Sequence, residues 1–203
     1  MAKTILYAAV SADGYVARPD GEVGPLFDWL GKGEVAWDWL GGELRTTQAT
    51  KDFIQAVYST EIGAMVVGRF VFDQTNGWGG QAVAGDHVFV VTHQAPTGWE
   101  FAGTAPFTFV TDGVESAIAQ AREVAGDRIV DVAAGDVGGQ ALRLGLIDQV
   151  VMNVVPVVFG EGRLFFGGAA GEVTLANPSL VAQGDRVTHL LYDVPQSARP
   201  ATH

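Results

Sequence analysis

The sequence contains no cysteine, and this absence excludes a disulfide framework, a thiol nucleophile and any metal site built on thiolates. No apolar run reaches the roughly 18 residues that a membrane-spanning helix requires. Basic residues are also scarce: 12 lysines and arginines stand against 23 acidic residues, so the formal net charge is -11. Such a balance disfavours nucleic acids and anionic membranes as partners. We therefore expect a cytoplasmic protein.

The apolar content is sufficient for one core. With 203 residues, 48% of them hydrophobic, we expect a single domain over residues 1–194 and a disordered tail over residues 195–203. Six short runs rich in valine, isoleucine and phenylalanine predict strands that are covered on both faces. They are Thr4 to Val10, Ala64 to Gly68, His87 to Thr92, Phe107 to Val110, Arg128 to Ala134 and Gln149 to Val158.

Helical patterns separate several of these runs. Thr50 to Ser59 carries its apolar residues on one side, and Gly113 to Ala125 follows Asp112, whose spacing to a glutamate resembles a capping box. No helical pattern separates Glu172 to Ala176 from Arg186 to Val194, so these two segments predict an antiparallel strand or hairpin at one edge. The alternation predicts an α/β fold.

The segment from Gly21 to Thr47 interrupts the alternation, because it combines Trp29, Trp37 and Trp39 with glycines and acidic residues. A long aromatic loop in a compact domain is often a functional lid. The alternative is a segment that buries its own tryptophans as a small satellite core. We expect the segment to lie near the substrate site.

Glycine-rich turns follow two of the predicted strands. At Gly135 to Gly139, free backbone N–H groups at a helix start would attract phosphate oxygens, although a plain strand-to-helix corner capped by Asp136 explains the same residues. Gly68 is followed by Arg69, whose guanidinium binds phosphate in a bidentate manner. Two such turns favour a dinucleotide ligand. At the end of a third strand, Thr92 and His93 could reach a ribose or an adenosine phosphate, whereas a solvated loop is the simpler explanation for His93.

An ordered set of motifs carries a family resemblance. The set is SADGYVA (11–17), VVGRFVFD (66–73), VVTH (90–93), AGDVGGQALRLGLID (134–148) and VVPVVFGEGRLFF (154–166). In this order and spacing the chain resembles the dihydrofolate reductase superfamily, and within it the C-terminal reductase domain of the bifunctional riboflavin-pathway deaminase-reductase. The resemblance implies a dihydrofolate reductase-like three-layer α/β fold with a central, mostly parallel, twisted sheet and an antiparallel C-terminal strand.

The resemblance also implies NADPH as the cofactor and assigns residues to it. Arg69, Thr92 and His93 would hold the adenosine end and its 2′-phosphate, next to Gly68. Ala9 and Val16 would present main-chain groups to the nicotinamide amide. The backbone of the turn at the second glycine cluster would hold the pyrophosphate, through Ala134, Gly135, Asp136, Val137, Gly138 and Gly139. No metal is expected.

Hydride transfer asks the protein for alignment, exclusion of water and a proton, so one acid can suffice. By analogy with folate reductases, the acid would be Asp52, although a first-turn acid is stabilised by the helix dipole whatever its function. The other candidate is Asp13, whose Asp-Gly pair could equally form a simple turn. We expect Trp29, Trp39 and Asn153 to contact the substrate.

The substrate implied by the resemblance is a small planar heterocycle, of the pteridine or riboflavin-precursor aminopyrimidine class. Two departures weaken the case for a phosphoribosyl substrate: Tyr15 replaces a lysine of the riboflavin-pathway pattern, and Ala133 replaces a glutamate. The competing hypothesis is a nucleotide-binding protein that kept the fold without efficient catalysis, since fold alone does not decide function. By analogy with relatives we also expect a homodimer.

Overall fold

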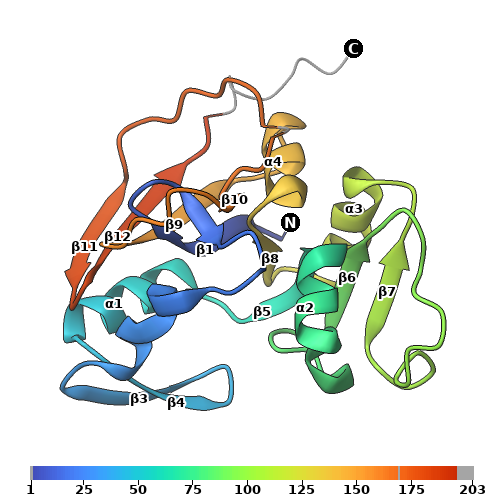
Figure 1. The fold of residues 1–203 in the computed structure, drawn as a ribbon, viewed down its shortest axis with the longest axis horizontal. Helices are drawn as coiled ribbons and strands as arrows, with labels where there is room; N and C mark the ends of the chain where they lie inside the picture. Colours follow the sequence, from blue (N-terminus) through green and yellow to red (C-terminus); the bar gives the residue numbers. More distant parts are fainter. Residues whose placement is uncertain (1, 169, 196–203) are drawn as a thin grey trace.

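The chain folds around one large sheet (Figure 1). Its strands are β1 (Thr4–Ser11), β5 (Ile62–Gly68), β6 (His87–Val91), β7 (Phe107–Val110), β8 (Ile129–Ala133), β9 (Gln149–Val155), β11 (Leu180–Gly184) and β12 (Val187–Asp193). The helices are α1 (Gln48–Val57), α2 (Arg69–Gly80), α3 (Val114–Ala125), α4 (Asp136–Arg143) and the 3-10 helix η1 (Gly24–Gly31). Two small sheets pair β2 (Tyr15–Ala17) with β10 (Arg163–Leu164) and β3 (Val35–Trp39) with β4 (Gly42–Thr46).

This computed structural model describes residues 2–168 and 170–195, so the expected tail lies outside the described residues from residue 196 onward. The 8-stranded sheet has the order β11-β12-β9-β1-β8-β5-β6-β7. The strands from β9 to β7 are parallel to one another, whereas β12 is antiparallel to both β9 and β11. The predicted α/β fold, with a mostly parallel sheet and an antiparallel C-terminal strand, is confirmed.

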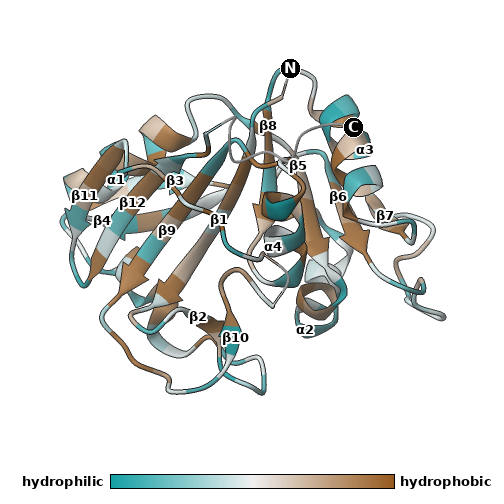
Figure 2. Cartoon of the chain, turned by 90° about the horizontal axis from the view of Figure 1, so that it is seen from above, coloured by the Kyte–Doolittle hydropathy of each residue, from teal (hydrophilic) through white to brown (hydrophobic). Residues whose placement is uncertain are grey.

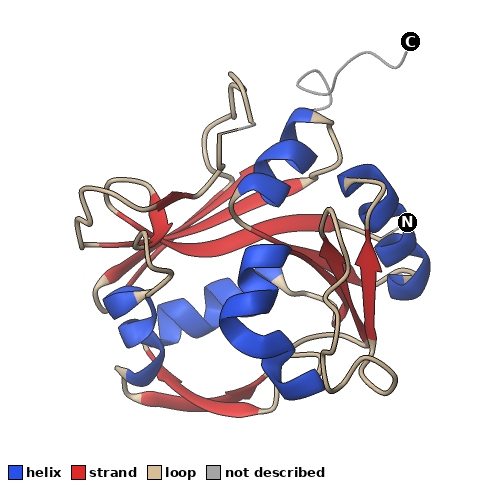
Figure 3. Ribbon diagram, turned by 45° about the vertical axis from the view of Figure 1, so that its right-hand side comes forward, coloured by secondary structure: helices blue, strands red, loops and turns tan. Residues whose placement is uncertain are grey.

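Helices cover both faces of the sheet, which forms the middle of three layers (Figure 3). On one face, α3 and α4 pack onto the strands through residues such as Ile118 and Leu142. On the other face, α1 packs through Phe53 and Ile54, and α2 packs through Phe72. The strands are therefore largely hydrophobic, whereas the outer sides of the helices carry the polar residues (Figure 2). Within the described residues, no helix combines the length and the apolar character that crossing a bilayer would take.

Two local predictions were wrong. Glu172 to Ala176 forms no strand, and the partner of β12 is instead β11, joined to it by a tight turn in which Arg186 has a φ of 56°. Asp112 does not cap α3. The cap position is Gly113, with a φ of 106° and no side-chain hydrogen bond, because a glycine there can take a backbone angle that aspartate rarely adopts.

The tryptophan-rich segment from Gly21 to Thr47 folds into η1 and the β3–β4 hairpin. Its tryptophans do not form a separate satellite core, because Trp29 belongs to the core on the α1 face and Trp37 and Trp39 pack against it. The indole N–H groups of Trp29 and Trp37 are both hydrogen-bonded. Trp29 donates to the Leu26 carbonyl at 2.8 Å, and Trp37 donates to the Thr46 hydroxyl at 3.0 Å. The segment thus closes the α1 side of the core.

Glycines allow α4 to approach the sheet and the neighbouring chain closely. A Cβ at Gly138 would collide with the Leu6 side chain, and one at Gly139 would collide with the Phe166 carbonyl. Both glycines are buried. The second half of the glycine cluster is therefore required for packing.

Replacement of Gly139 by alanine tests this close approach. We expect the free energy of unfolding to fall by roughly 1 to 3 kcal/mol, because the added methyl group must displace backbone. Urea denaturation measures the change. Gly103→Ala is the matched control, since no atom lies within 4 Å of its added Cβ. Equal stability of both variants would contradict the contact between α4 and the segment at Phe166.

Candidate functional site

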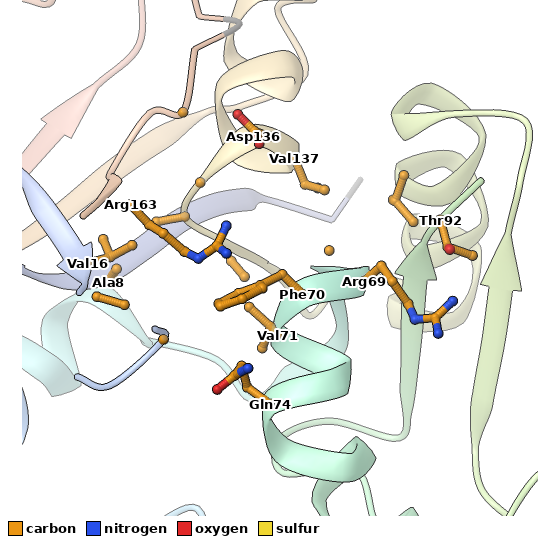
Figure 4. Close-up of a pocket in the computed structure, with 18 of the residues that line it drawn as sticks. Ala8, Val16, Arg69, Phe70, Val71, Gln74, Thr92, Asp136, Val137 and Arg163 are labelled. Carbon is orange, nitrogen blue, oxygen red and sulfur yellow. The ribbon is translucent and has the colours of Figure 1, made fainter. Parts of the chain in front are cut away.

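A cavity lies at the carboxyl ends of the parallel strands (Figure 4). Its volume is about 1280 Å³, enough for an extended ligand of dinucleotide size. This edge of an open α/β sheet is where ligands usually bind. The strand ends that line it are Tyr7 to Ala9 of β1, Gly68 of β5, Val91 to Gln94 after β6, and Ala133 to Gly135 of β8 and its turn.

The turn between β8 and α4 forms one wall of the cavity. Gly135 has a φ of 107°, and a Cβ there would point into open space, so the turn needs glycine for its conformation and leaves room beside the backbone. The Gly135 N–H is already donated to the Phe165 carbonyl at 2.7 Å. The amides of Asp136 and Val137, in the first turn of α4, therefore remain the donors for an anion.

An acidic side chain accompanies this helix start. The Asp136 carboxylate accepts a hydrogen bond from the Gly168 amide at 3.1 Å, which ties the chain after β10 to α4. In Figure 4 its side chain points away from Phe70 and Arg163, toward the top of the view. The carboxylate thus has a structural partner, and it reduces the positive potential of the helix start without blocking it.

Two arginines approach the cavity from opposite sides (Figure 4). The Arg163 guanidinium lies 3.2 Å from the centroid of the Phe70 ring, a cation–π contact between β10 and α2. Arg69 donates from Nε to Asp73 at 2.7 Å and from Nη1 to the Gln94 carbonyl at 2.9 Å. Arg69 therefore places a cation at one end of the cavity, on the loop after β6. Arg163 places another in the middle, beside α4.

Most residues predicted to bind a cofactor come together around this cavity. Its lining includes Ala9, Val16, Gly68, Arg69, Thr92, His93, Ala134, Gly135, Asp136 and Val137. Gly138 and Gly139 do not line it, because they lie on the side of α4 that packs against Leu6 and Phe166. The Thr92 hydroxyl donates to the same Gln94 carbonyl as Arg69, at 2.9 Å, so the loop after β6 is held by two donors.

Asp13 does not line the cavity. Its carboxylate joins two loops, accepting hydrogen bonds from the Ser11 hydroxyl at 2.6 Å, the Gly160 amide at 2.7 Å and the Phe159 amide at 3.1 Å. The Ser11 hydroxyl above all, with the two amides, holds the pKa of this carboxyl below its ordinary value. A carboxylate stabilised in this way is a poor proton donor. Its contacts agree with the alternative in which the Asp-Gly pair forms a turn.

Asp52 is also not brought to the cavity. It is exposed on α1 and accepts a hydrogen bond from the Gln48 side-chain amide at 2.6 Å, one turn earlier on the same helix. The apolar residues of α1, including Phe53 and Ile54, face the sheet instead. Position along the sequence suggested Asp52, but the helix turns this side chain toward solvent.

The three predicted substrate residues lie behind the cavity wall. Trp29 is 2% exposed and packs edge-on against His189, with ring centroids 5.2 Å apart. Trp39 packs against Tyr7 at 6.4 Å, and Asn153 is fully buried. None of the three lines the cavity.

Sequence reasoning missed the aromatic residues that do line the cavity. These are Tyr7, Phe27, Phe70 and Trp78, which come from β1, η1 and α2. Trp78 has a φ of 49° within a left-handed turn that also includes Asn76, an unfavourable conformation for a side chain of this size. No pattern in the sequence predicts such a turn. Tyr7 could have been found, because side chains along β1 alternate between the two faces of the sheet.

A buried carboxyl lies beneath the cavity. Asp131, in the middle of β8, is 8% exposed, and burial raises the pKa of its carboxyl from an ordinary value of 3.8 to about 7. The Tyr58 hydroxyl, 3.5 Å away, partly opposes this shift. Burial together with the Asp131 charge raises the pKa of both Tyr58 and Tyr7, so their hydroxyls stay protonated at neutral pH.

The raised pKa makes stability depend on pH. The folded state favours the neutral form of Asp131, so ionisation of this carboxyl lowers the free energy of unfolding. This loss is absent below pH 3.8, grows as the pH rises and is complete above pH 7. We expect Asp131→Asn to gain up to roughly 4 kcal/mol of unfolding free energy relative to wild type between pH 4 and pH 8. Urea denaturation of both proteins across this range measures the difference.

Comparing wild type with Asp131→Asn cancels the effects of other titratable groups on the free energy of unfolding. Burial lowers the pKa of His189 to about 4, so that residue destabilises the fold as the pH falls, in the opposite sense to Asp131. His189 is present in both proteins, and its contribution cancels. A stability difference that stays constant from pH 4 to pH 8 would show that Asp131 titrates in the fold as it does in the unfolded chain.

No family model matches the chain. YwjB of Bacillus subtilis strain 168, an uncharacterized protein, is 25% identical over 183 residues, which cover 85% of this chain and 87% of the relative. This similarity over nearly the full length of both proteins does not by itself assign a function.

Solved structures share the fold. A proposed riboflavin biosynthesis protein from Shewanella sp. PV-4 has a TM-score of 0.67 and 21% identity, over 96% of this chain and 99% of the other. A pyrimidine reductase-like protein from Corynebacterium diphtheriae has a TM-score of 0.60 and 14% identity, over 95% of this chain and 92% of the other.

A bifunctional protein also matches. It is the diaminohydroxyphosphoribosylaminopyrimidine deaminase/5-amino-6-(5-phosphoribosylamino)uracil reductase of Thermotoga maritima, with a TM-score of 0.60 and 16% identity, and the chain spans 57% of its length. The chain therefore has the dihydrofolate reductase-like fold that these reductase-related proteins share, as the motifs implied.

Proposed function

We propose that the chain is an NADPH-dependent reductase that acts on a small planar heterocycle. The observation that carries the proposal is the continuous cavity across the ends of β1, β8, β5 and β6, which combines a glycine-lined helix start with two arginines and an aromatic region. The fold shared with proteins described as riboflavin-pathway or pyrimidine reductases supports the same class. A nicotinamide cofactor would supply the hydride.

The residues at the cavity fit such a cofactor. The open space beside Gly135 lets a pyrophosphate approach the amides of Asp136 and Val137, with Arg163 close to the same wall. Arg69, Thr92 and His93 gather at the other end, where an adenosine 2′-phosphate would find a cation. Gly113, with a φ of 106° and nothing near its Cβ position, leaves additional room at that end.

The remaining part of the cavity suits the substrate. Tyr7, Phe27, Phe70 and Trp78 present aromatic surfaces to it, and Gln74 adds an amide. Aromatic faces stack on planar heterocycles, and a few polar groups among them fix orientation. These features support a pteridine-like or aminopyrimidine substrate.

Titration of the protein with NADPH and, separately, NADH tests the cofactor. Tryptophan quenching and nicotinamide fluorescence report binding. We expect NADPH to bind at least tenfold more tightly than NADH, because only NADPH carries the 2′-phosphate that Arg69 can bind. Absence of binding by either nucleotide would remove the reductase proposal.

Variants of the two arginines separate the ends of the cavity. We expect Arg69→Gln to weaken NADPH binding by about 10- to 100-fold while leaving NADH binding nearly unchanged, and Arg163→Gln to weaken both. Arg143→Gln is the matched control, because Arg143 is exposed at the opposite end of α4. Thermal melting checks that each variant is folded. Equal loss of both nucleotides in Arg69→Gln would contradict a 2′-phosphate site there.

NADPH consumption with 7,8-dihydropterin or 5-amino-6-ribosylaminouracil then tests for turnover. Oxidation of NADPH that depends on one of these compounds is expected. Tight NADPH binding without consumption would instead favour a nucleotide-binding protein without efficient catalysis, since neither Asp13 nor Asp52 lines the cavity.

A further inference from the structure

Three ionisable groups, Tyr7, Tyr58 and Asp131, lie together at the β1 side of the cavity. The Tyr58 hydroxyl donates toward the Asp131 carboxylate at 3.5 Å, and the rings of Tyr58 and Tyr7 meet edge-on with centroids 5.6 Å apart. Asp131 and Tyr58 do not line the cavity, whereas Tyr7 does. Of the three residues, Tyr7 is therefore the one in a position to meet a bound ligand.

A second chain of hydrogen bonds ends on β1, at the residue after Tyr7. Thr50 and Asn153 bind the two ring nitrogens of His189, at 2.9 Å from Nε2 and 2.7 Å from Nδ1. The Asn153 side-chain amide also donates to the Ala8 carbonyl at 3.4 Å. Because a carbonyl only accepts, the Asn153 Nδ2 must face β1 and its Oδ1 must face His189.

This orientation decides which groups Asn153 presents to Tyr7. Burial raises the pKa of the Tyr7 hydroxyl most, and the Asn153 side chain partly opposes this shift. With its oxygen bound to the His189 Nδ1–H, Asn153 has only N–H groups to offer Tyr7. An N–H group accepts no hydrogen bond from the hydroxyl, so the Tyr7 proton is left for another acceptor.

The surroundings of Asp131 leave few groups that act on its charge. Its neighbours in the sheet are Ile5 on β1 and Met65 on β5, which are both apolar. From the elements packed against it, the titratable groups that face it are Tyr58, just after α1, and Tyr7 on β1. No cation is among the groups that shift its ionisation, so the carboxyl exchanges its proton close to neutral pH.

We propose that Tyr7 is the proton donor to a heterocycle bound in this cavity, and that Asp131 and Tyr58 form the proton reservoir behind it. The proposal rests on the proposed reductase function, because the carbon of a C=N or C=O bond that gains a hydride leaves the neighbouring heteroatom to be protonated. The Tyr7 O–H bond breaks as the heteroatom gains the proton. The phenolate then regains a proton from neutral Asp131, which is refilled from solvent.

Asn153 and His189 do not line the cavity, so they do not donate the proton in this scheme. The ligand class follows from the donor. It is a planar heterocycle whose reducible bond ends in a carbonyl oxygen or imine nitrogen, because the Tyr7 hydroxyl requires an acceptor.

Tyrosine carbon-13 NMR tests the proton site in the free protein. With [ζ-13C]tyrosine, we expect the signals of Tyr7 and Tyr58, assigned from their phenylalanine variants, to shift with a midpoint near pH 7. The step should vanish in Asp131→Asn. In Tyr58→Phe the midpoint of the Tyr7 signal should move to higher pH, because the carboxylate loses a donor. Tyr192, on the opposite face of the sheet, is the internal control.

A Tyr7 signal without a step between pH 5 and pH 9, or with an unchanged step in Asp131→Asn, would overturn the reservoir. This outcome does not depend on cofactor binding. Conversely, absence of NADPH binding would overturn the proposed reductase function. The tyrosine titration would still decide whether the proton site exists. The two failures are therefore distinguishable.

Turnover tests the donor role with 7,8-dihydropterin or 5-amino-6-ribosylaminouracil, whichever the NADPH-loaded wild type reduces. We expect Tyr7→Phe to lower kcat at least 100-fold with an unchanged dissociation constant for NADPH, and Tyr192→Phe to retain wild-type kcat. In wild type kcat should fall as the pH rises through about 7, and Asp131→Asn should abolish this fall. An unchanged kcat in Tyr7→Phe would exclude Tyr7 as the donor.

Discussion

The insertion of β8 between β1 and β5 determines the rest of the structure. The three strands are parallel, so their carboxyl ends lie at one edge of the sheet, and the segments that leave them must diverge there. The chain leaving β8 enters α4, and the chain leaving β5 enters α2. The cavity forms where these segments separate, and its glycines permit the close approach of backbone at that point. The location of the site is thus a consequence of strand order.

The alternation of side chains along β8 gives this strand two different roles. Val130 and Val132 face α3 and α4 and belong to the larger core, whereas Asp131 points to the α1 face, toward Tyr58. The same strand ends in the turn at Gly135. One element therefore connects the glycine-lined wall of the cavity with the ionisable cluster beneath its floor. A shift of one residue in register would exchange the faces and bury Asp131 among the apolar residues of the larger core.

Sequence reasoning predicted the fold better than the site, for physical reasons. Buried parallel strands require continuous apolar runs, and those of β1, β5, β7 and β8 are visible without a structure. The positions of Asp13 and Asp52 depended instead on the direction in which each side chain points, which hydrogen bonds to Gly160 and Gln48 fix in space. The tryptophans of residues 21–47 were assigned to the substrate because aromatic loops are often functional, but core packing at η1 and the hairpin uses them.

Asp131 shows why a strand can hide a functional group. Within a run of valines and isoleucine a single aspartate does not break the strand pattern, and its position on the opposite face from Val130 and Val132 becomes meaningful only when Tyr58 and Tyr7 are placed beside it. A carboxyl with a raised pKa costs stability at neutral pH, whereas a residue without charge at this position would not. Buried His189 carries a similar cost at acidic pH and orients the Asn153 amide, which donates to the Ala8 carbonyl. Asp131 and Asn153 both influence the pKa of Tyr7, so both departures from a purely apolar core lie close to one residue of the cavity lining.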